Sequence, residues 1–195
     1  MKTTWTIDPA HTQAEFSAKH MMITNVRGRF DGASGTIELD EADPTNSSVV
    51  ATLDASTINT GQAQRDGHLK GPDFLDVGRF PAITFRSTKV EKAGDGYRIT
   101  GDLTIKDVTK SVVLEAEFLG VVTNMQGGRH AGFTGRTRID RESWGLTWNV
   151  GLEAGGWLVG KDVTISIDAA ADQPVADKSA SIAEKPASAA FSRAA

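Results

Sequence analysis

The chain has 195 residues, of which 39% are hydrophobic, so it supports one domain of ordinary size with a substantial core. Its 21 lysines and arginines against 25 aspartates and glutamates give a formal charge of −4, which excludes broad electrostatic attraction to nucleic acid or anionic lipid. No cysteine is present, which excludes disulfides and thiolate metal sites.

The N-terminal residues MKTTWTIDPAHTQ contain neither the apolar core nor the small-residue cleavage site of a secretory signal. We therefore expect a cytoplasmic location. No run approaches the roughly 18 apolar residues of a membrane span, so no span is expected.

The first third of the chain alternates apolar and polar residues, which is typical of half-buried strands. Strands are expected at residues 5–7, 14–22, 26–30, 36–39 and 49–58. In the second of these, Phe16 and His20 fall on the same apolar face.

Residues 60–77 break this alternation, and we interpret them as a cap over a β structure. Residues 62–70 are expected to form about two helical turns, and Pro72 suits the start of a second short turn. Phe74 and Leu75 in that turn must be buried by packing onto the structure below.

Three polar residues of the cap, Arg65, Asp66 and His68, cluster on the expected helix. They favour binding of a polar ligand head group, although a solvated helix face explains them nearly as well.

Alternation resumes after Pro81, with strands expected at residues 82–90, 97–105, 112–118, 133–139 and 163–167. About eight to ten meander-connected strands fit an antiparallel barrel or a sandwich, which the pattern does not separate. The apolar faces carry many small residues, namely Ala14, Ala18, Gly28, Gly101, Ala116 and Gly135. These leave space for a small ligand inside a barrel; alternatively, the glycines permit coiling and bulges.

The other sequence motifs do not indicate a metal site or a nucleic-acid site. The four histidines have no i,i+2 or i,i+4 pairing, so no metal site is expected. The only basic group consists of Arg129, Arg136, Arg138 and Arg141 and lacks interleaved exposed aromatics, so no nucleic-acid groove is expected. From Asp172 the composition is rich in alanine and serine, which predicts a barrel or sandwich domain at residues 1–171 and a disordered tail at 172–195.

Four segments carry a resemblance to a known family: DPAHTQAEFSAKHMMITNVRGRF, HLKGPDFLDVGRFPAITF, LTIKDVTKSVVLEAEF and IDRESWGLTWN. Together they resemble the YceI-like, or polyisoprenoid-binding, family over about residues 3–168. The resemblance implies an all-β fold, an extended lipocalin-like antiparallel β-barrel whose hollow interior holds a long isoprenoid tail, and a homodimer. The motif residues that match are His11, Phe16, His20, His68, Phe74, Phe80, Pro81 and Phe85, with Trp144 where the family often has Phe.

Residues and resemblance together predict a non-enzymatic carrier or storage protein for an isoprenoid or quinone-like lipid, without a resident cofactor. The alternatives are a binder of fatty acids or other amphipaths, and an uncharacterised hydrolase that uses His20 or His68. The expected ligand-binding residues are Phe16, His20, Arg65, His68, Phe74, Phe85, Gly101, Ala116 and Trp144.

Overall fold

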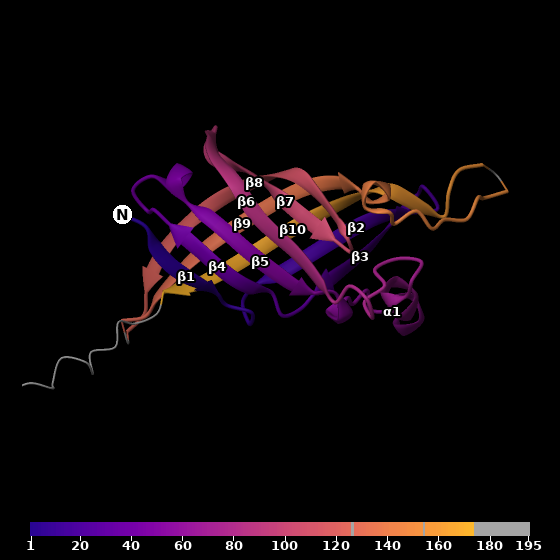
Figure 1. Cartoon of the computed structure of the whole chain (residues 1–195), viewed down its shortest axis with the longest axis horizontal. Coiled ribbons are helices and arrows are strands. Elements are labelled where there is room, and N and C mark those ends of the chain that lie inside the picture. Colours follow the sequence, from indigo (N-terminus) through magenta and orange to yellow (C-terminus); the bar gives the residue numbers. More distant parts are fainter. Residues whose placement is uncertain (126, 154, 174–195) are drawn as a thin grey trace, which may run out of the picture.

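The computed structural model describes residues 1–125, 127–153 and 155–173, and within them the fold is all-β with a helical cap (Figure 1). The strands are β1 (Thr3–Ile7), β2 (Gln13–His20), β3 (Thr24–Phe30), β4 (Ser34–Leu39), β5 (Ser48–Asp54), β6 (Ala82–Ala93), β7 (Gly96–Ile105), β8 (Val108–Thr123), β9 (Arg129–Asp140) and β10 (Val159–Gln173). The helices are α1 (Ala63–Lys70) and the 3₁₀ turns η1 (Pro44–Asn46), η2 (Ala55–Thr57) and η3 (Arg141–Trp144).

The strands close into an antiparallel barrel of eight, because β1 with β2 and β3 with β4 each act as one bent strand. Both β1 and β2 pair along β10, while β4 pairs with β1 and β3 with β2. At the bend after β1, the Thr12 hydroxyl donates to the Ala170 carbonyl at 3.2 Å and accepts from the Ala170 N–H at 3.1 Å. This side chain replaces the ladder bonds that the bend interrupts. The structure thus decides for the barrel over the sandwich.

Short connections of two or three residues join β2 to β3, β6 to β7 and β7 to β8. Lys106, with a φ of 57°, and Asp107 form the two-residue turn between β7 and β8, which is shorter than the gap between the strands expected at 97–105 and 112–118. The strand expected at 14–22 ends at His20, because Met21 and Met22 both take positive φ angles in the turn to β3.

The alternation predicts correctly which residues face inward. Inward side chains of the long strands gather into two packed clusters, one at each end of the barrel. The first, at the capped end, includes Phe74, Leu103, Ile139 and Trp144. The second, around Trp5 and Leu39, lies toward the opposite end.

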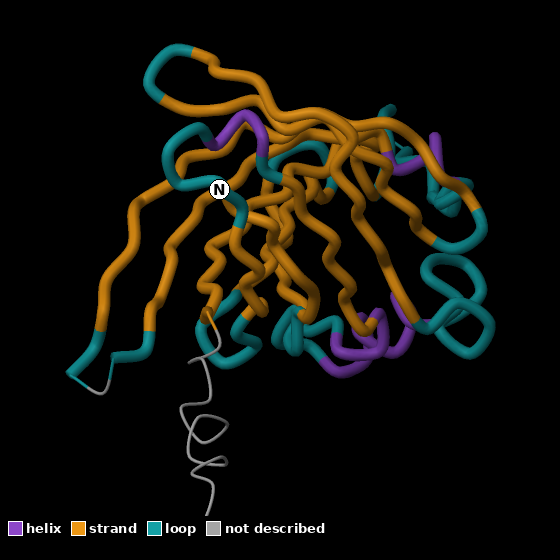
Figure 2. The backbone as a smooth tube through the Cα atoms, turned by 60° about the vertical axis from the view of Figure 1, so that its left-hand side comes forward, coloured by secondary structure: helices purple, strands orange, loops and turns teal. Residues whose placement is uncertain are grey.

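The cap lies at the end of the barrel where β3 and β5 finish, as Figures 1 and 2 show. Helix α1 confirms the two expected turns. The segment after it forms turns, as expected, and Asp76 adopts a positive φ of 48° there. Phe74 and Leu75 are each only 7% exposed, so this segment does pack down onto the barrel.

Strand β10 continues to Gln173, two residues beyond the expected domain boundary. Asp172 pairs with His130, and Gln173 accepts a hydrogen bond from Arg129, so both belong to the barrel rather than to the tail. The rest of the expected tail lies outside the described residues. In the part of the chain described, no helix has the length and apolar character needed to cross a membrane.

Candidate functional site

The barrel encloses an apolar cavity of about 360 Å³, a volume typical of small-molecule sites. Every strand contributes lining residues, and the cap adds Leu69, Phe74 and Leu75. Of the small inward residues expected from the sequence, Ala14, Ala18, Ala116 and Gly135 line it, which confirms that these positions leave space there. This wall can desolvate a long apolar ligand and offers it few hydrogen bonds.

Four of the nine expected ligand residues line this cavity: Phe16, Phe74, Phe85 and Ala116. Phe16 is packed against Phe30, with ring centroids 5.6 Å apart. The other five, which are His20, Arg65, His68, Gly101 and Trp144, are not part of the cavity wall.

Packing around two inward glycines explains why Gly101 is not part of the cavity wall. A Cβ atom on Gly101 would lie 2.4 Å from the Cζ atom of Phe85, and one on Gly28 would lie 2.5 Å from the Cζ atom of Phe16. Both glycines therefore make room for phenylalanine rings, and the expectation that they leave open space is wrong.

The polar residues of the cap, Arg65, Asp66 and His68, form hydrogen bonds that stabilise the fold. Arg65 donates from Nε to the Thr60 hydroxyl at 2.7 Å and from Nη2 to the Thr60 carbonyl at 3.0 Å. Asp66 accepts from the N–H of Thr60 at 2.9 Å. These bonds tie the start of α1 to the segment that leads into it, so the Arg65 guanidinium is occupied locally.

His68 joins two parts of the cap. Its Nε2 atom lies 2.9 Å from Asp73 Oδ2, and its ring stands edge-on to Trp148 at 4.6 Å and to Phe74 at 5.1 Å. Through these contacts α1 is held against the loop that precedes β10. Phe74 and Trp148 also touch, at 5.4 Å, so the three rings form one cluster above the cavity.

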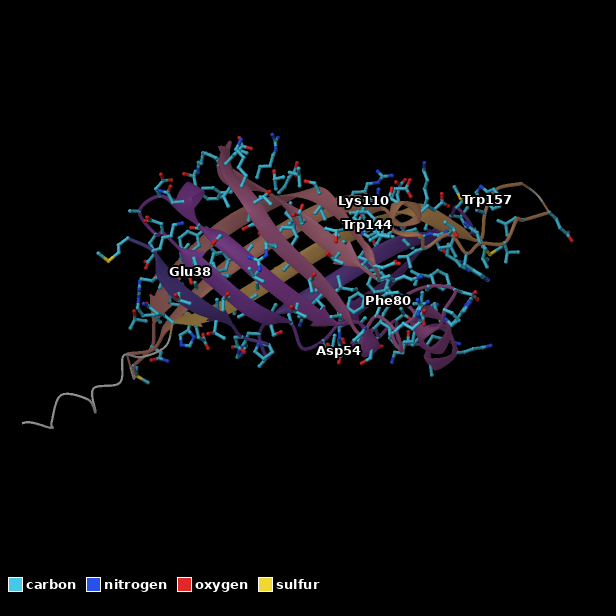
Figure 3. The ribbon with its side chains drawn as sticks, in the orientation of Figure 1. Glu38, Asp54, Phe80, Lys110, Trp144 and Trp157 are labelled. Atoms are coloured by element: carbon cyan, nitrogen blue, oxygen red, sulfur yellow. The ribbon has the colours of Figure 1, made fainter. Side chains whose placement is uncertain are left out.

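Trp144 and His20 lie at the edge of the site. Trp144 is buried and donates from Nε1 to the Leu103 carbonyl at 3.1 Å, which fastens η3 to β7. Figure 3 shows it at the barrel end, whereas Trp157, 58% exposed, lies on the loop that extends beyond. His20 ends β2 opposite Val159.

The remaining histidines pair with single carboxylates. His11 Nδ1 lies 2.5 Å from Asp8 Oδ2, which raises the pKa of His11 and lowers the pKa of Asp8. His130 Nδ1 lies 2.6 Å from Asp172 Oδ1. The described residues contain no group of three or more His, Cys, Asp or Glu side chains suited to a metal ion.

The cavity wall also contains a buried charged residue that was not among the expected ligand residues. Arg141, at the start of η3, is 3% exposed and lines the cavity beside Leu146 and Val159. The sequence contained a signal for it, because Arg141 continues the inward series of Phe133, Gly135, Thr137 and Ile139 along β9. Its charge instead places it in the same basic group as the outward arginines Arg136 and Arg138.

A closed antiparallel barrel with an internal apolar cavity and a helical cap defines a lipocalin-like barrel. A family model for the YceI-like domain matches residues 5–171. A UPF0312 protein of Staphylococcus aureus (strain USA300) is 38% identical over 168 residues, covering 86% of this chain and 96% of that protein. The chain therefore belongs to the YceI-like family.

Solved structures agree with this assignment. The crystal structure of Burkholderia cenocepacia BcnA has a TM-score of 0.70 at 25% identity and covers 84% of this chain and 98% of its own. The Campylobacter jejuni YceI protein has a TM-score of 0.68 at 30% identity, with coverages of 80% and 90%. A polyisoprenoid binding domain from Saccharophagus degradans shares the fold, with a TM-score of 0.60 at 13% identity and coverages of 87% and 98%.

Proposed function

We propose that this protein binds one isoprenoid or quinone-like lipid without turning it over, and that the lipid tail occupies the barrel cavity. The observation that carries the proposal is the cavity itself, which every strand lines with mostly apolar side chains. Each buried CH₂-sized group contributes about 0.8 kcal/mol, so one five-carbon unit contributes roughly 3 to 4 kcal/mol before the cost of ordering it.

Family membership supports an isoprenoid over other tails. The Saccharophagus degradans domain with this fold is described as polyisoprenoid binding. A fatty acid or another amphipath is the main alternative, because the cavity wall recognises apolar surface without regard to branching.

A hydrolase that uses His20 or His68 is a weaker candidate. Neither histidine lines the cavity, and His68 is engaged with Asp73 and Trp148 at the cap. A ligand whose tail fills the barrel would therefore not be presented to either ring.

Native mass spectrometry of the purified protein, followed by organic extraction, tests this proposal. The expected result is a bound lipid of isoprenoid mass released intact, with no turnover of ester substrates. A co-purified fatty acid would favour the alternative ligand, and turnover that disappears in His20→Ala or His68→Ala would favour the enzyme. The homodimer implied by the family stays a prediction, which light scattering of the same sample tests.

A further inference from the structure

Two loops at the capped end of the barrel carry exposed apolar side chains. One is the turn from β2 to β3, and the other comprises residues 145–153 and 155–158, which reach beyond the barrel in Figure 1. A contiguous group of exposed apolar residues marks a site of interaction, whereas single ones are common on any protein surface. Five large apolar side chains, each between 44% and 78% exposed, form such a group, which we call the apolar tip: Met21, Met22, Ile23, Val150 and Trp157.

Backbone contacts join the two loops into one surface. The Met21 N–H donates to the Leu158 carbonyl at 2.8 Å, and the Leu158 N–H donates to the Val150 carbonyl at 2.9 Å. A Cβ atom on Gly156 would lie 3.3 Å from the Cγ atom of Met22. The apolar tip is therefore continuous across both loops.

The base of the longer loop is fixed to the barrel and to the cap. The Asn149 side chain donates from Nδ2 to the Val159 carbonyl at 2.7 Å and accepts from the Val159 N–H at 3.0 Å. Trp148, one residue earlier, packs on His68 and Phe74 of the cap. The apolar tip is thus presented on a hydrogen-bonded base, beside the cap that covers the cavity.

The turn from β2 to β3 holds two methionines in a conformation that methionine disfavours. The Ile23 N–H donates to the His20 carbonyl at 3.2 Å, and Met21 and Met22 between them have φ angles of 49° and 64°. Such turns ordinarily carry Asn-Gly, because those residues take a positive φ at little cost. Methionine makes the turn less stable and gains little burial here, which indicates that its apolar side chain serves a contact outside the fold.

Charge is sparse on the apolar tip and positive behind it. Among the described residues of 21–25 and 149–158, Glu153 alone has a charged side chain. Lys19 and Lys161 follow on β2 and β10, where both are exposed and Lys161 has only a long contact, of 3.8 Å, to a carboxylate. Apolar residues in front, a tryptophan among them and lysines behind match the layers of a bilayer surface, where tryptophan and lysine lie at the level of the head groups.

The size and shape of the apolar tip favour a bilayer over a protein partner. Its five side chains expose roughly 500 Å² together, less than the roughly 800 Å² that each partner buries in a stable protein–protein interface. Figure 3 shows Trp157 on a loop that projects from the barrel end rather than on a flat face. A bilayer accepts such a projection, because its hydrocarbon adapts to the shape of the apolar group that enters it.

We propose that the apolar tip inserts into the surface of a lipid bilayer, so that the capped end of the barrel faces the membrane. The formal charge of −4 gives no general attraction to anionic lipid, so apolar contact carries the binding. The proposal goes beyond the binding of a lipid in the cavity and does not depend on it. If both hold, docking places the cap next to the membrane from which an apolar ligand is drawn.

Sedimentation of the full-length protein with phosphatidylcholine vesicles tests the proposal, and Trp157 reports insertion. Trp5 and Trp144 are buried, so Trp157 should dominate any change in tryptophan emission. The protein should pellet with the vesicles at both low and high salt, and its emission should shift to shorter wavelength and be quenched by lipids with brominated chains. Protein that stays in the supernatant with unshifted emission would overturn the proposal.

Two double variants separate insertion from folding. Met21→Asn with Met22→Gly gives the turn its ordinary residues, so the melting temperature should hold or rise while the partition coefficient onto vesicles falls about tenfold or more. Val122→Asn with Met125→Asn removes side chains that are 70% and 99% exposed from the hairpin between β8 and β9, at the opposite end, and should change neither. Equal loss of vesicle binding in both double variants would show adhesion without a defined site and overturn the proposal.

Light scattering of the same proteins tests a second copy of the chain as the occupant. A dimer that dissociates in the Met21→Asn, Met22→Gly variant, in protein that does not pellet with vesicles, would assign the apolar tip to a dimer interface and overturn the proposal. Failure on vesicles differs from failure of the proposed function, because the vesicles contain no isoprenoid and titration of the cavity with isoprenols needs no bilayer.

Discussion

The ring of Phe85 on β6 lies over Gly101 on the neighbouring β7, so close that a Cβ atom on Gly101 would fall 2.4 Å from the ring. The glycine thus provides the space in which the ring sits, and the ring in turn forms part of the cavity wall. Phe16 and Gly28 repeat this arrangement across β2 and β3. An aromatic ring over a glycine protects the backbone that the missing side chain would expose.

This relationship predicts opposite effects at two inward glycines. Gly101→Ala should lower the free energy of unfolding by about 1 to 3 kcal/mol, because the Phe85 ring and the Arg86 carbonyl, 2.6 Å from the new Cβ, must both move. Gly135→Ala is the matched control, because its Cβ would meet Leu114 at an ordinary 3.6 Å. It should be neutral or stabilise by up to about 1 kcal/mol. Urea denaturation checks both, and equal effects at the two sites would contradict the prediction.

Ala116 is the better position at which to narrow the cavity. Ala116→Leu adds three carbons to the wall on β8, so it should weaken the binding of long tails more than that of short ones. Val113→Leu lies on the outer face of the same strand, where the side chain is 42% exposed, and should change neither. Titration of both variants with a short and a long isoprenol is the measurement. A uniform loss for both ligands would argue against a steric effect on the tail.

Phe74 connects the cap to the cavity. Phe74→Ala removes a buried ring that contacts His68 and Trp148, so unfolding should become easier by about 3 kcal/mol, and bound lipid should dissociate faster. Phe80→Ala, in the same segment but outside the cavity wall, should leave the dissociation rate unchanged. Stopped-flow release of a fluorescent lipid measures the rate. Identical rates in the wild type and Phe74→Ala would show that the cap does not retain ligand.

The hydrogen-bonded pair of Asp8 and His11, which is not part of the cavity wall, predicts that the stability of the fold depends on pH. The hydrogen bond raises the pKa of His11 above its ordinary 6.5, so its stabilising contribution is complete below pH 6.5 and is lost as the pH rises through the raised value. The lowered pKa of Asp8 means that its contribution is present above pH 3.8 and is lost as the pH falls through the lowered value.

NMR titration of the His11 ring tests this directly. Asp8→Asn should return its midpoint toward 6.5, whereas Asp31→Asn removes a carboxylate from another bend and should not. An unchanged midpoint in Asp8→Asn would rule the pair out as the cause.

Alternation was enough to predict the inward face of each long strand, because one buried face forces a period of two. Barrel closure was not predictable from it, because closure depends on the bends at residues 8–12 and 31–33, which let the four strands β1 to β4 act as two long bent strands. The family resemblance supplied that part.

The site was predicted less completely, and for physical reasons. Gly101 faces inward as expected, but its filling by Phe85 comes from a diagonal neighbour on another strand, which spacing along one strand does not reveal. Arg65 and His68 were chosen for their charge, yet both are occupied by local partners in the cap. Arg141 was not predictable as a wall residue, because arginine side chains are rarely fully buried even where the alternation places them on the inward face.

The central claim is that the barrel interior holds an isoprenoid tail, and the dependence of affinity on tail length tests it most directly. Neutral isoprenols of two to eight units, titrated against the wild type, avoid any contribution from a charged head. The dissociation constant should fall several-fold with each added unit and then level off once the cavity is full, because each unit buries further apolar surface at some cost in chain order. A dissociation constant that is the same for short and long tails would contradict the account.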